Sequence, residues 1–109
     1  PKEVVVDDSE IRRAIKHSIN TLITTIKSAI EETPPELVAD IMHRGIVLVG
    51  GGSLLRGLDR LVAEETRIPV EVAEDPMSAV VRGTGVILEN LDSLAEVLVS
   101  SGYQKAPTM

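Results

Sequence analysis

The chain has 109 residues, 43% of them hydrophobic, which suits one domain with a single core. Its net charge of −6 argues against a nucleic-acid partner, and the absence of cysteine excludes disulfides and thiolate chemistry. Two separated histidines, His17 and His43, do not indicate a metal site. No apolar run reaches the roughly 18 residues that a membrane span needs, so the sequence predicts no membrane element.

The first predicted elements are a short strand and a long helix. The valines at residues 4–6 predict the strand, and the polar run from Asp7 to Glu10 offers N-caps for a helix that extends to about Glu32. A helix packed on one side against a layer is favoured over a coiled coil, because the apolar stripe is broad and shorter than four clean heptads. The stripe comprises Ile11, Ile15, Ile19, Leu22, Ile23, Ile26 and Ile30.

A second helix is predicted from the segment Thr33-Pro34-Pro35-Glu36. Thr33 is expected to cap it, Pro34 to take the first helical position, and Glu36 to complete a capping box. Gly45 is expected to end this helix in the left-handed conformation. The predicted apolar face carries Leu37, Val38, Ile41 and Met42.

A strand, a glycine turn, a helix and a second strand follow. Residues 46–49 are continuously apolar between glycines, which predicts a strand buried on both faces. After the glycines, Ser53 is expected to cap a helix, and Pro69 marks the entry to a strand at residues 70–73. The inward side of the helix is predicted to carry Leu54, Leu55, Leu58, Leu61 and Val62.

The last predicted elements are two helices and a tail. The pair Asp75-Pro76 is expected to open a helix, and Ser93 to cap a short one that ends near Ser100. One domain is therefore expected over residues 1–102, with a flexible tail at 103–109. The order β-α-α-β-α-β-α indicates the α/β class, with parallel central strands covered by helices.

The triple glycine after the first buried strand is the best candidate site. A glycine turn at the carboxyl end of such a strand lets a ligand touch the backbone, although a tight turn that needs glycine only for its dihedral angles is the alternative. The turn is not a P-loop, because Gly57 is followed by Leu58, nor a dinucleotide fingerprint, because Leu55 replaces the required Gly or Ala. Contact with a base and sugar is therefore favoured over a phosphate cradle.

A second constellation of small residues lies in the helix after Pro76. A glycine inside a helix lowers helix stability by about 1 kcal/mol relative to alanine. The presence of Gly83 and Gly85 in this helix therefore requires an explanation. Ala79 and Gly83 share one face, where another helix could approach closely; packing inside this same domain is the alternative. The carboxylates show no pairing that suggests acid–base catalysis.

Several segments together resemble the C-terminal third of the MreB family of bacterial actin homologues, from Pro1 to about Ser101. The glycine turn alone would indicate only the wider superfamily of actin, Hsp70 and sugar kinases, whereas the long motif that contains it is specific to MreB and its close relatives. The matching segments are ETPPEL (32–37), GIVLVGGGSLLRGLD (45–59), AEDP (73–76), GTG (83–85) and LENLD (88–92).

The resemblance implies a partial actin-like (ribonuclease H-like) subdomain with ATP as its ligand. The family's adenosine motif corresponds here to Gly50, Gly51, Gly52, Ser53 and Leu54. The inter-domain hinge helix corresponds to the helix with Ala79, Gly83 and Gly85. The family forms ATP-dependent filaments in the cytoplasm, at the inner face of the membrane, and governs rod shape. The implied partners are adenine nucleotide and further copies of the protein.

The resemblance also implies what this chain lacks. The family's phosphate-binding hairpins, catalytic acid, magnesium environment and membrane-inserting elements correspond to sequence upstream of Pro1. No ATPase activity is therefore expected from this chain alone, and Mg²⁺ is expected only in the full-length parent. The missing strands 1 and 2 should leave one edge of residues 46–49 unpaired, so the chain is expected to move its first strand into the gap or to self-associate.

Two other functions remain open at this point. One is a stand-alone Rossmann-like enzyme domain, in which Glu71 or Glu74 would have to serve as the ribose-binding acid. The other is a helical interaction module without a ligand, whose glycines only shape turns.

Overall fold

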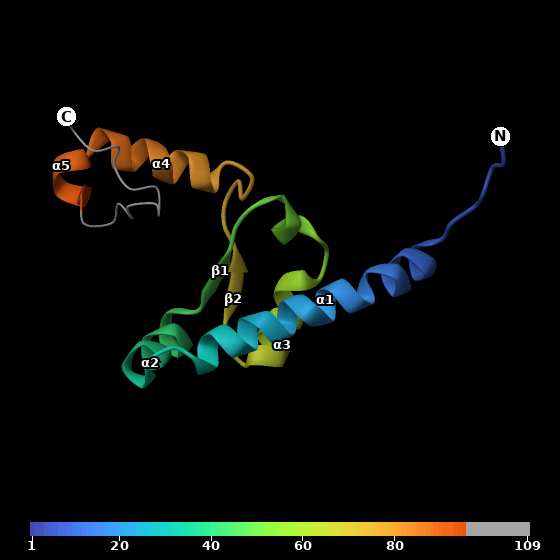
Figure 1. The fold of residues 1–109 in the computed structure, drawn as a ribbon, viewed down its shortest axis with the longest axis horizontal. Coiled ribbons are helices and arrows are strands. Elements are labelled where there is room, and N and C mark those ends of the chain that lie inside the picture. Colours follow the sequence, from blue (N-terminus) through green and yellow to red (C-terminus); the bar gives the residue numbers. More distant parts are fainter. Residues whose placement is uncertain (96–109) are drawn as a thin grey trace, which may run out of the picture.

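The computed structural model describes residues 1–95. It confirms the predicted α/β class, with helices packed against one face of a parallel pair of strands (Figure 1). The predicted end of the last helix and the predicted tail at 103–109 lie outside the described residues. In chain order the elements are α1 (Asp8–Glu31), α2 (Pro35–Arg44), β1 (Ile46–Leu48), the 3₁₀ turn η1 (Gly51–Leu54), α3 (Leu58–Thr66), β2 (Val70–Val72), α4 (Ala79–Glu89) and α5 (Leu91–Leu94).

The two strands and α3 form a β-α-β unit. β1 and β2 pair in parallel, with Ile46 beside Val70 and Leu48 beside Val72. The ladder is closed at one end by Ile46 N–H donating to the Pro69 carbonyl over 2.8 Å. Parallel strands need a crossover connection, and α3 supplies it here.

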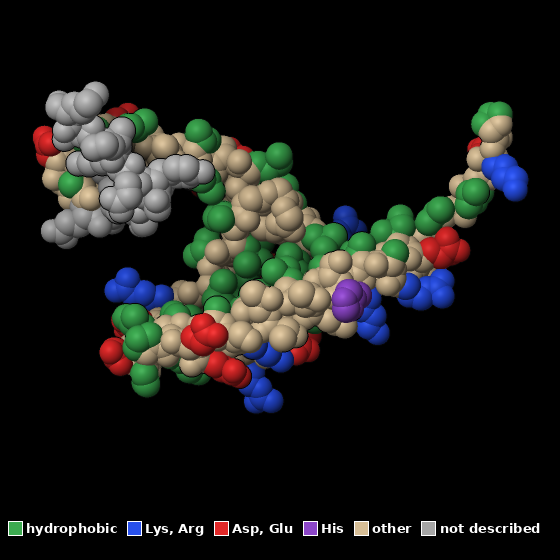
Figure 2. All heavy atoms as spheres, in the orientation of Figure 1, with side chains coloured by type: hydrophobic (Ala, Val, Ile, Leu, Met, Phe, Trp, Pro, Cys, Tyr) green, Lys and Arg blue, Asp and Glu red, His purple; other side chains and the backbone are tan. Residues whose placement is uncertain are grey.

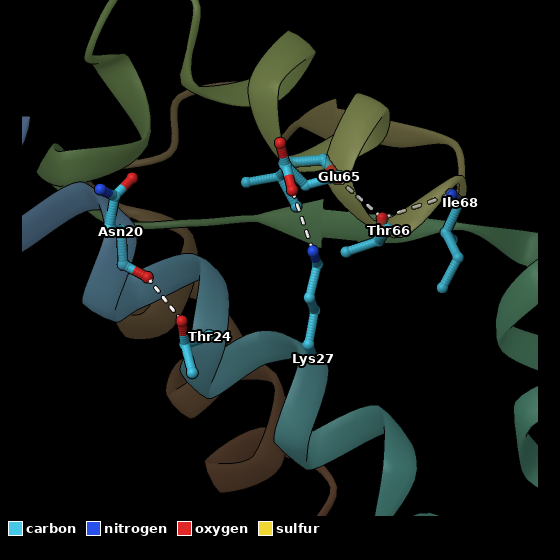
Figure 3. A network of polar contacts seen from close by, with 7 residues as sticks. Asn20, Thr24, Lys27, Glu65, Thr66 and Ile68 are labelled. Atoms are coloured by element: carbon cyan, nitrogen blue, oxygen red, sulfur yellow. Dashed lines mark hydrogen bonds and ion pairs between the residues drawn. The ribbon is translucent and has the colours of Figure 1, made fainter.

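The core lies between the sheet, α3 and the second half of α1. Val62 of α3 is fully buried, and Ile23 of α1 is 6% exposed. The Lys27 ammonium of α1 also pairs with the Glu65 carboxylate of α3 over 2.9 Å (Figure 3). These contacts confirm that α1 packs on a layer. The core cluster is Ile23, Leu58 and Val62, with Ile19, Ile26, Ile46, Leu48, Leu61 and Val70 packed against it.

The predicted first strand is wrong. Residues 1–7 have no ladder pairing, and Val4, Val5 and Val6 are 74%, 89% and 53% exposed. A strand exists only when a neighbour accepts its backbone hydrogen bonds, and no described segment lies beside this one. The adjoining helix start is confirmed, because the Asp7 carboxylate accepts the Glu10 N–H over 2.8 Å.

Two predictions of burial are also wrong. β1 is covered on one face only, so Val47 is 53% exposed, because the described residues supply helices to one side of the sheet. The stripe of α1 packs from Ile19 onward, whereas Ile11 remains 53% exposed. On α2, Leu37 and Met42 are likewise at the surface.

The junctions of α2 differ from the prediction at both ends. Thr33 makes no capping box, because its hydroxyl donates to the Ala29 carbonyl of the preceding helix, and Pro34 is the N-cap. Gly45 ends α2 with φ of 88°, as expected, but its ψ of −175° is not left-handed helical. A Cβ on Gly45 would lie 2.7 Å from the Pro69 carbonyl oxygen, so glycine permits the chain to enter the sheet here.

The chain is extended. Its radius of gyration is 19.0 Å, whereas a compact chain of this length has about 13 Å. No residue of α4 is buried, and hydrophobic side chains lie at the surface along it (Figure 2). Among the described helices, none combines the length and the apolar character that crossing a membrane requires.

Candidate functional site

The glycine turn joins the carboxyl ends of the two strands. Gly50 follows β1 with φ of 86°, which favours glycine. Its N–H donates to the carbonyl of Pro76, in the loop after β2, over 2.8 Å. The five predicted site residues therefore lie in one turn at the carboxyl ends of the strands, where parallel α/β folds bind ligands.

Ser53 holds the turn from inside, and it does not cap a helix as predicted. Its side chain is buried, and both its N–H and its hydroxyl donate to the Gly50 carbonyl, over 3.2 Å and 2.6 Å. The turn continues as η1, and α3 begins only after Gly57, whose φ is 87°. Because the loop between η1 and α3 redirects the chain, Leu54 and Leu55 are exposed and do not face the core.

Gly51 and Gly52 are open to solvent. A Cβ added to either residue would meet nothing within 4 Å, and neither has a positive φ. Dihedral angles therefore explain Gly50 but not its two neighbours. Within residues 1–95, the amides of Gly51 and Gly52 donate to no acceptor. Exposed, unpaired N–H groups of this kind can donate to a ligand that approaches the backbone.

The loop after β2 is a second part of the site that the sequence prediction missed. Asp75 does not start a helix, because it adopts φ of 45°, a conformation that Asp tolerates better than most residues. Arg82 of α4 fixes this loop by donating to the Glu74 and Asp75 carbonyls over 2.6 Å and 3.1 Å. Ser78 Oγ donates to the Asp75 carboxylate over 2.5 Å. The Asp-Pro pair was the available signal, but it was interpreted as a helix start.

The two glycines of α4 have open space beside them in the described structure. A Cβ added to Gly83 or Gly85 would meet nothing within 4 Å, so packing within residues 1–95 does not explain them. Ala79, at the first position of α4, is partly buried. The space beside the glycines is available to a partner from outside this segment.

One hollow of the described residues lies away from the glycine turn. It is an open groove of about 810 Å³ between the first half of α1 and residues 55–61. The turn itself is an exposed surface, which makes it one wall of a site and not an enclosed pocket. Among residues 1–95, no group of three or more His, Asp or Glu side chains is placed to hold a metal ion.

Comparison with known proteins identifies the family. The model of the family described as MreB/Mbl protein matches residues 1–96. The chain belongs to the MreB/Mbl family. Relatives include the cell shape-determining proteins Mbl of Bacillus subtilis and MreB of Escherichia coli, both 48% identical to this chain. The alignments cover 86% and 84% of this chain but only 28% and 26% of those proteins, so it spans little more than a quarter of their length.

Solved structures confirm the actin-like fold of this MreB/Mbl segment. Crystal structures of MreB5 of Spiroplasma citri, one bound to ADP and one to AMPPNP, superpose with a TM-score of 0.79 at 31% identity. Each match covers 88% of this chain and 29% of the solved chain. The chain therefore has the fold of a partial actin-like subdomain, and the predicted resemblance is confirmed.

Proposed function

We propose that this chain forms the adenosine-facing wall of the nucleotide site in an MreB-like cytoskeletal protein that assembles ATP-dependent filaments and determines rod shape. The observation that carries the proposal is that the N–H groups of Gly51 and Gly52, at the carboxyl ends of the strands, are exposed and unpaired among the described residues. Support comes from the relatives, which are named as cell shape-determining proteins, and from the MreB5 structures with bound ADP and AMPPNP.

Each residue of the turn has a distinct role in this proposal. Gly50 shapes the turn, and Ser53 holds it from inside through the Gly50 carbonyl. The Gly51 and Gly52 amides donate to polar edges of the adenosine, and glycine is needed there because any side chain would fill the space of the ligand. Leu54, 57% exposed, offers an apolar surface for the base.

In this proposal the chain binds nucleotide but does not hydrolyse it. Phosphoryl transfer requires the γ-phosphate, the metal ion and the attacking water to be positioned together. The turn contacts base and sugar only, so Mg²⁺ and the catalytic groups belong to the remainder of the full-length protein. That protein would act in the cytoplasm, at the inner face of the membrane, where copies assemble through contacts that this chain supplies only in part.

Nucleotide titration of the ¹⁵N-labelled chain tests the proposal. ATP should shift the amide signals of Gly51 and Gly52, because these groups would donate to the adenosine. GTP should shift these signals less, because the amides would donate to the polar edge of adenine, and guanine presents a different edge. Shifts with NAD but not ATP would favour a Rossmann-like domain, and no shift with any nucleotide would contradict the proposal.

The variant Gly51→Val tests whether the turn itself binds the nucleotide. Its Cβ meets nothing within 4 Å, so the variant should unfold at the same urea concentration as the wild type while its ATP-dependent shifts disappear. Phosphate release from ATP should stay at the buffer rate for both chains. Turnover by the wild type that Gly51→Val abolishes would overturn the claim that this chain does not hydrolyse ATP.

A further inference from the structure

We propose that Arg82 is a positioning residue for the glycine turn. From α4 it holds residues 74–78, called the β2–α4 loop below, and through the Pro76 carbonyl of that loop it sets the direction of the Gly51 amide. The consequence for nucleotide binding rests on the function proposed above, whereas the positioning itself is a property of the chain without nucleotide.

The Arg82 guanidinium joins the two ends of the β2–α4 loop. Its Nη2 donates to the Glu74 and Asp75 carbonyls over 2.6 Å and 3.1 Å, where the chain leaves β2. Its Nε donates over 2.9 Å to Ser78 Oγ, immediately before α4. One planar guanidinium therefore ties the start of the loop to its end, which the single ammonium of a lysine could not do in the same way.

Pro76 lies in the middle of the loop that Arg82 clamps. The Ser78 N–H donates to the Asp75 carbonyl over 3.1 Å, which closes a four-residue turn with proline at its second position, where proline is favoured. Pro76 is buried, and its carbonyl accepts the Gly50 N–H over 2.8 Å. This hydrogen bond joins the clamped loop to the glycine turn.

Gly50 is held on both sides. Its N–H bonds to Pro76, and its carbonyl accepts the N–H and the hydroxyl of Ser53 over 3.2 Å and 2.6 Å. A peptide unit is planar, so the Gly51 N–H lies in the plane of the Gly50 carbonyl and, in a trans peptide, points the opposite way. Fixing the peptide planes before and after Gly50 therefore fixes the direction of the Gly51 N–H.

The alternative is that Arg82 only stabilises α4. A side chain with that role bonds within its helix, as the Asn90 side chain does when it donates to the Val86 carbonyl over 2.9 Å. Arg82 instead reaches back eight residues, to the carbonyl of Glu74. Its bonds are therefore placed to shape the loop that supports the turn.

Loss of the clamp should loosen the turn without unfolding the chain. Ser53 would still hold the Gly50 carbonyl, because both residues lie within the turn itself. The core cluster is built from α1, α3 and the strands and does not include Arg82. The expected effect is therefore local to Gly50 and the amides that follow it.

Amide hydrogen exchange of the nucleotide-free chain tests the positioning. Arg82→Met keeps a long side chain and a similar helix propensity but removes every donor. The Gly50 N–H should then exchange about tenfold faster, because the charge-assisted hydrogen bonds that hold its acceptor are lost. Arg82→Lys should recover only part of the protection, since it keeps the charge without the planar fork. An unchanged exchange rate at Val62 shows that the packed core is intact.

Asn90→Ala is the matched control. It removes a side-chain hydrogen bond at the other end of α4 and leaves the β2–α4 loop untouched. The Gly50 exchange rate should stay within about twofold of the wild type, because separated sites act independently.

Titration with ATP tests the consequence for binding. The dissociation constant, measured from the Gly51 and Gly52 amide shifts, should rise about tenfold in Arg82→Met, because a site loses affinity when its supporting groups no longer hold it. It should keep the wild-type value in Asn90→Ala.

Three outcomes would overturn the proposal. The first is wild-type Gly50 exchange in Arg82→Met, and the second is equal acceleration in Asn90→Ala, which would mean that loosening α4 anywhere has the same effect. The third is an unchanged ATP dissociation constant in Arg82→Met, which would leave the adenosine site standing without a role for Arg82. If no chain responds to ATP, the function proposed above fails, and the Gly50 exchange rates still decide whether Arg82 positions the turn.

Discussion

α3 and α4 are helices of similar length with opposite surroundings. Val62 of α3 is fully buried between α1 and the sheet, whereas Val81 of α4 is 67% exposed. Val80 and Leu88 of α4 are 68% and 64% exposed. The difference lies in what surrounds each helix, because both sequences carry apolar residues.

The contrast divides the chain by role. The half built from α1, α3 and the sheet holds itself together, while α4 leaves apolar and small residues exposed among the described residues. The glycine turn lies where the two halves meet, since Gly50 bonds to Pro76 of the loop that Arg82 fixes. A ligand at the turn would therefore contact the packed half beside the start of the exposed helix.

The largest expected effect comes from Val62→Ala. Removing buried methyl groups at the centre of the packed half should lower the free energy of unfolding by about 2–3 kcal/mol. Val81→Ala is the matched control, and it should change the free energy of unfolding by less than about 0.5 kcal/mol because Val81 packs on nothing described. Urea unfolding followed by circular dichroism measures both. Equal losses would remove the distinction between the two halves.

The next largest effect on stability is expected at Gly45, with Gly51 as its matched control. Gly45→Ala should lower the free energy of unfolding by about 2 kcal/mol, because its Cβ would meet the Pro69 carbonyl at a positive φ. Gly51→Ala meets open space at an ordinary φ, so its urea midpoint should stay at the wild-type value. A stability loss at Gly51 would mean that the turn needs glycine for folding and not for a ligand.

The smallest effect is expected in α4. Gly85→Ala should favour the local helix by about 1 kcal/mol and raise the helical signal in circular dichroism, because nothing lies near the added Cβ. The same change should lower activity of a full-length relative, where a partner segment would occupy that space. Lower helicity in this chain would show that α4 already packs closely on something here.

Local signals predicted much of the packed half. The spacing of Ile19, Ile23 and Ile26 located the buried face of α1. The first paired strand was found from its apolar run at residues 46–49, and the second from Pro69 at its entry. The specific motif around Gly50 identified the family correctly. These features depend on residues close together in the sequence, where hydrophobic periodicity and glycine positions directly indicate helices, strands and turns.

The failures share one physical cause. The first strand, the covered second face of β1 and the inward Leu55 each required a neighbour at a distance in the sequence or outside this chain. Ser53 and Thr33 were assigned as caps by residue type, but their hydroxyls donate to the carbonyls of Gly50 and Ala29 instead. A propensity says which bonds a side chain can make, and only the fold decides which partner is within reach.

Amide hydrogen exchange of the nucleotide-free chain tests the division into two halves most directly. Protection follows burial and packing, so the account predicts slow exchange in α3 and the second half of α1, and fast exchange throughout α4. Protection of α4 equal to that of α3 would contradict the account, because it would mean that α4 is packed without any partner from outside this segment.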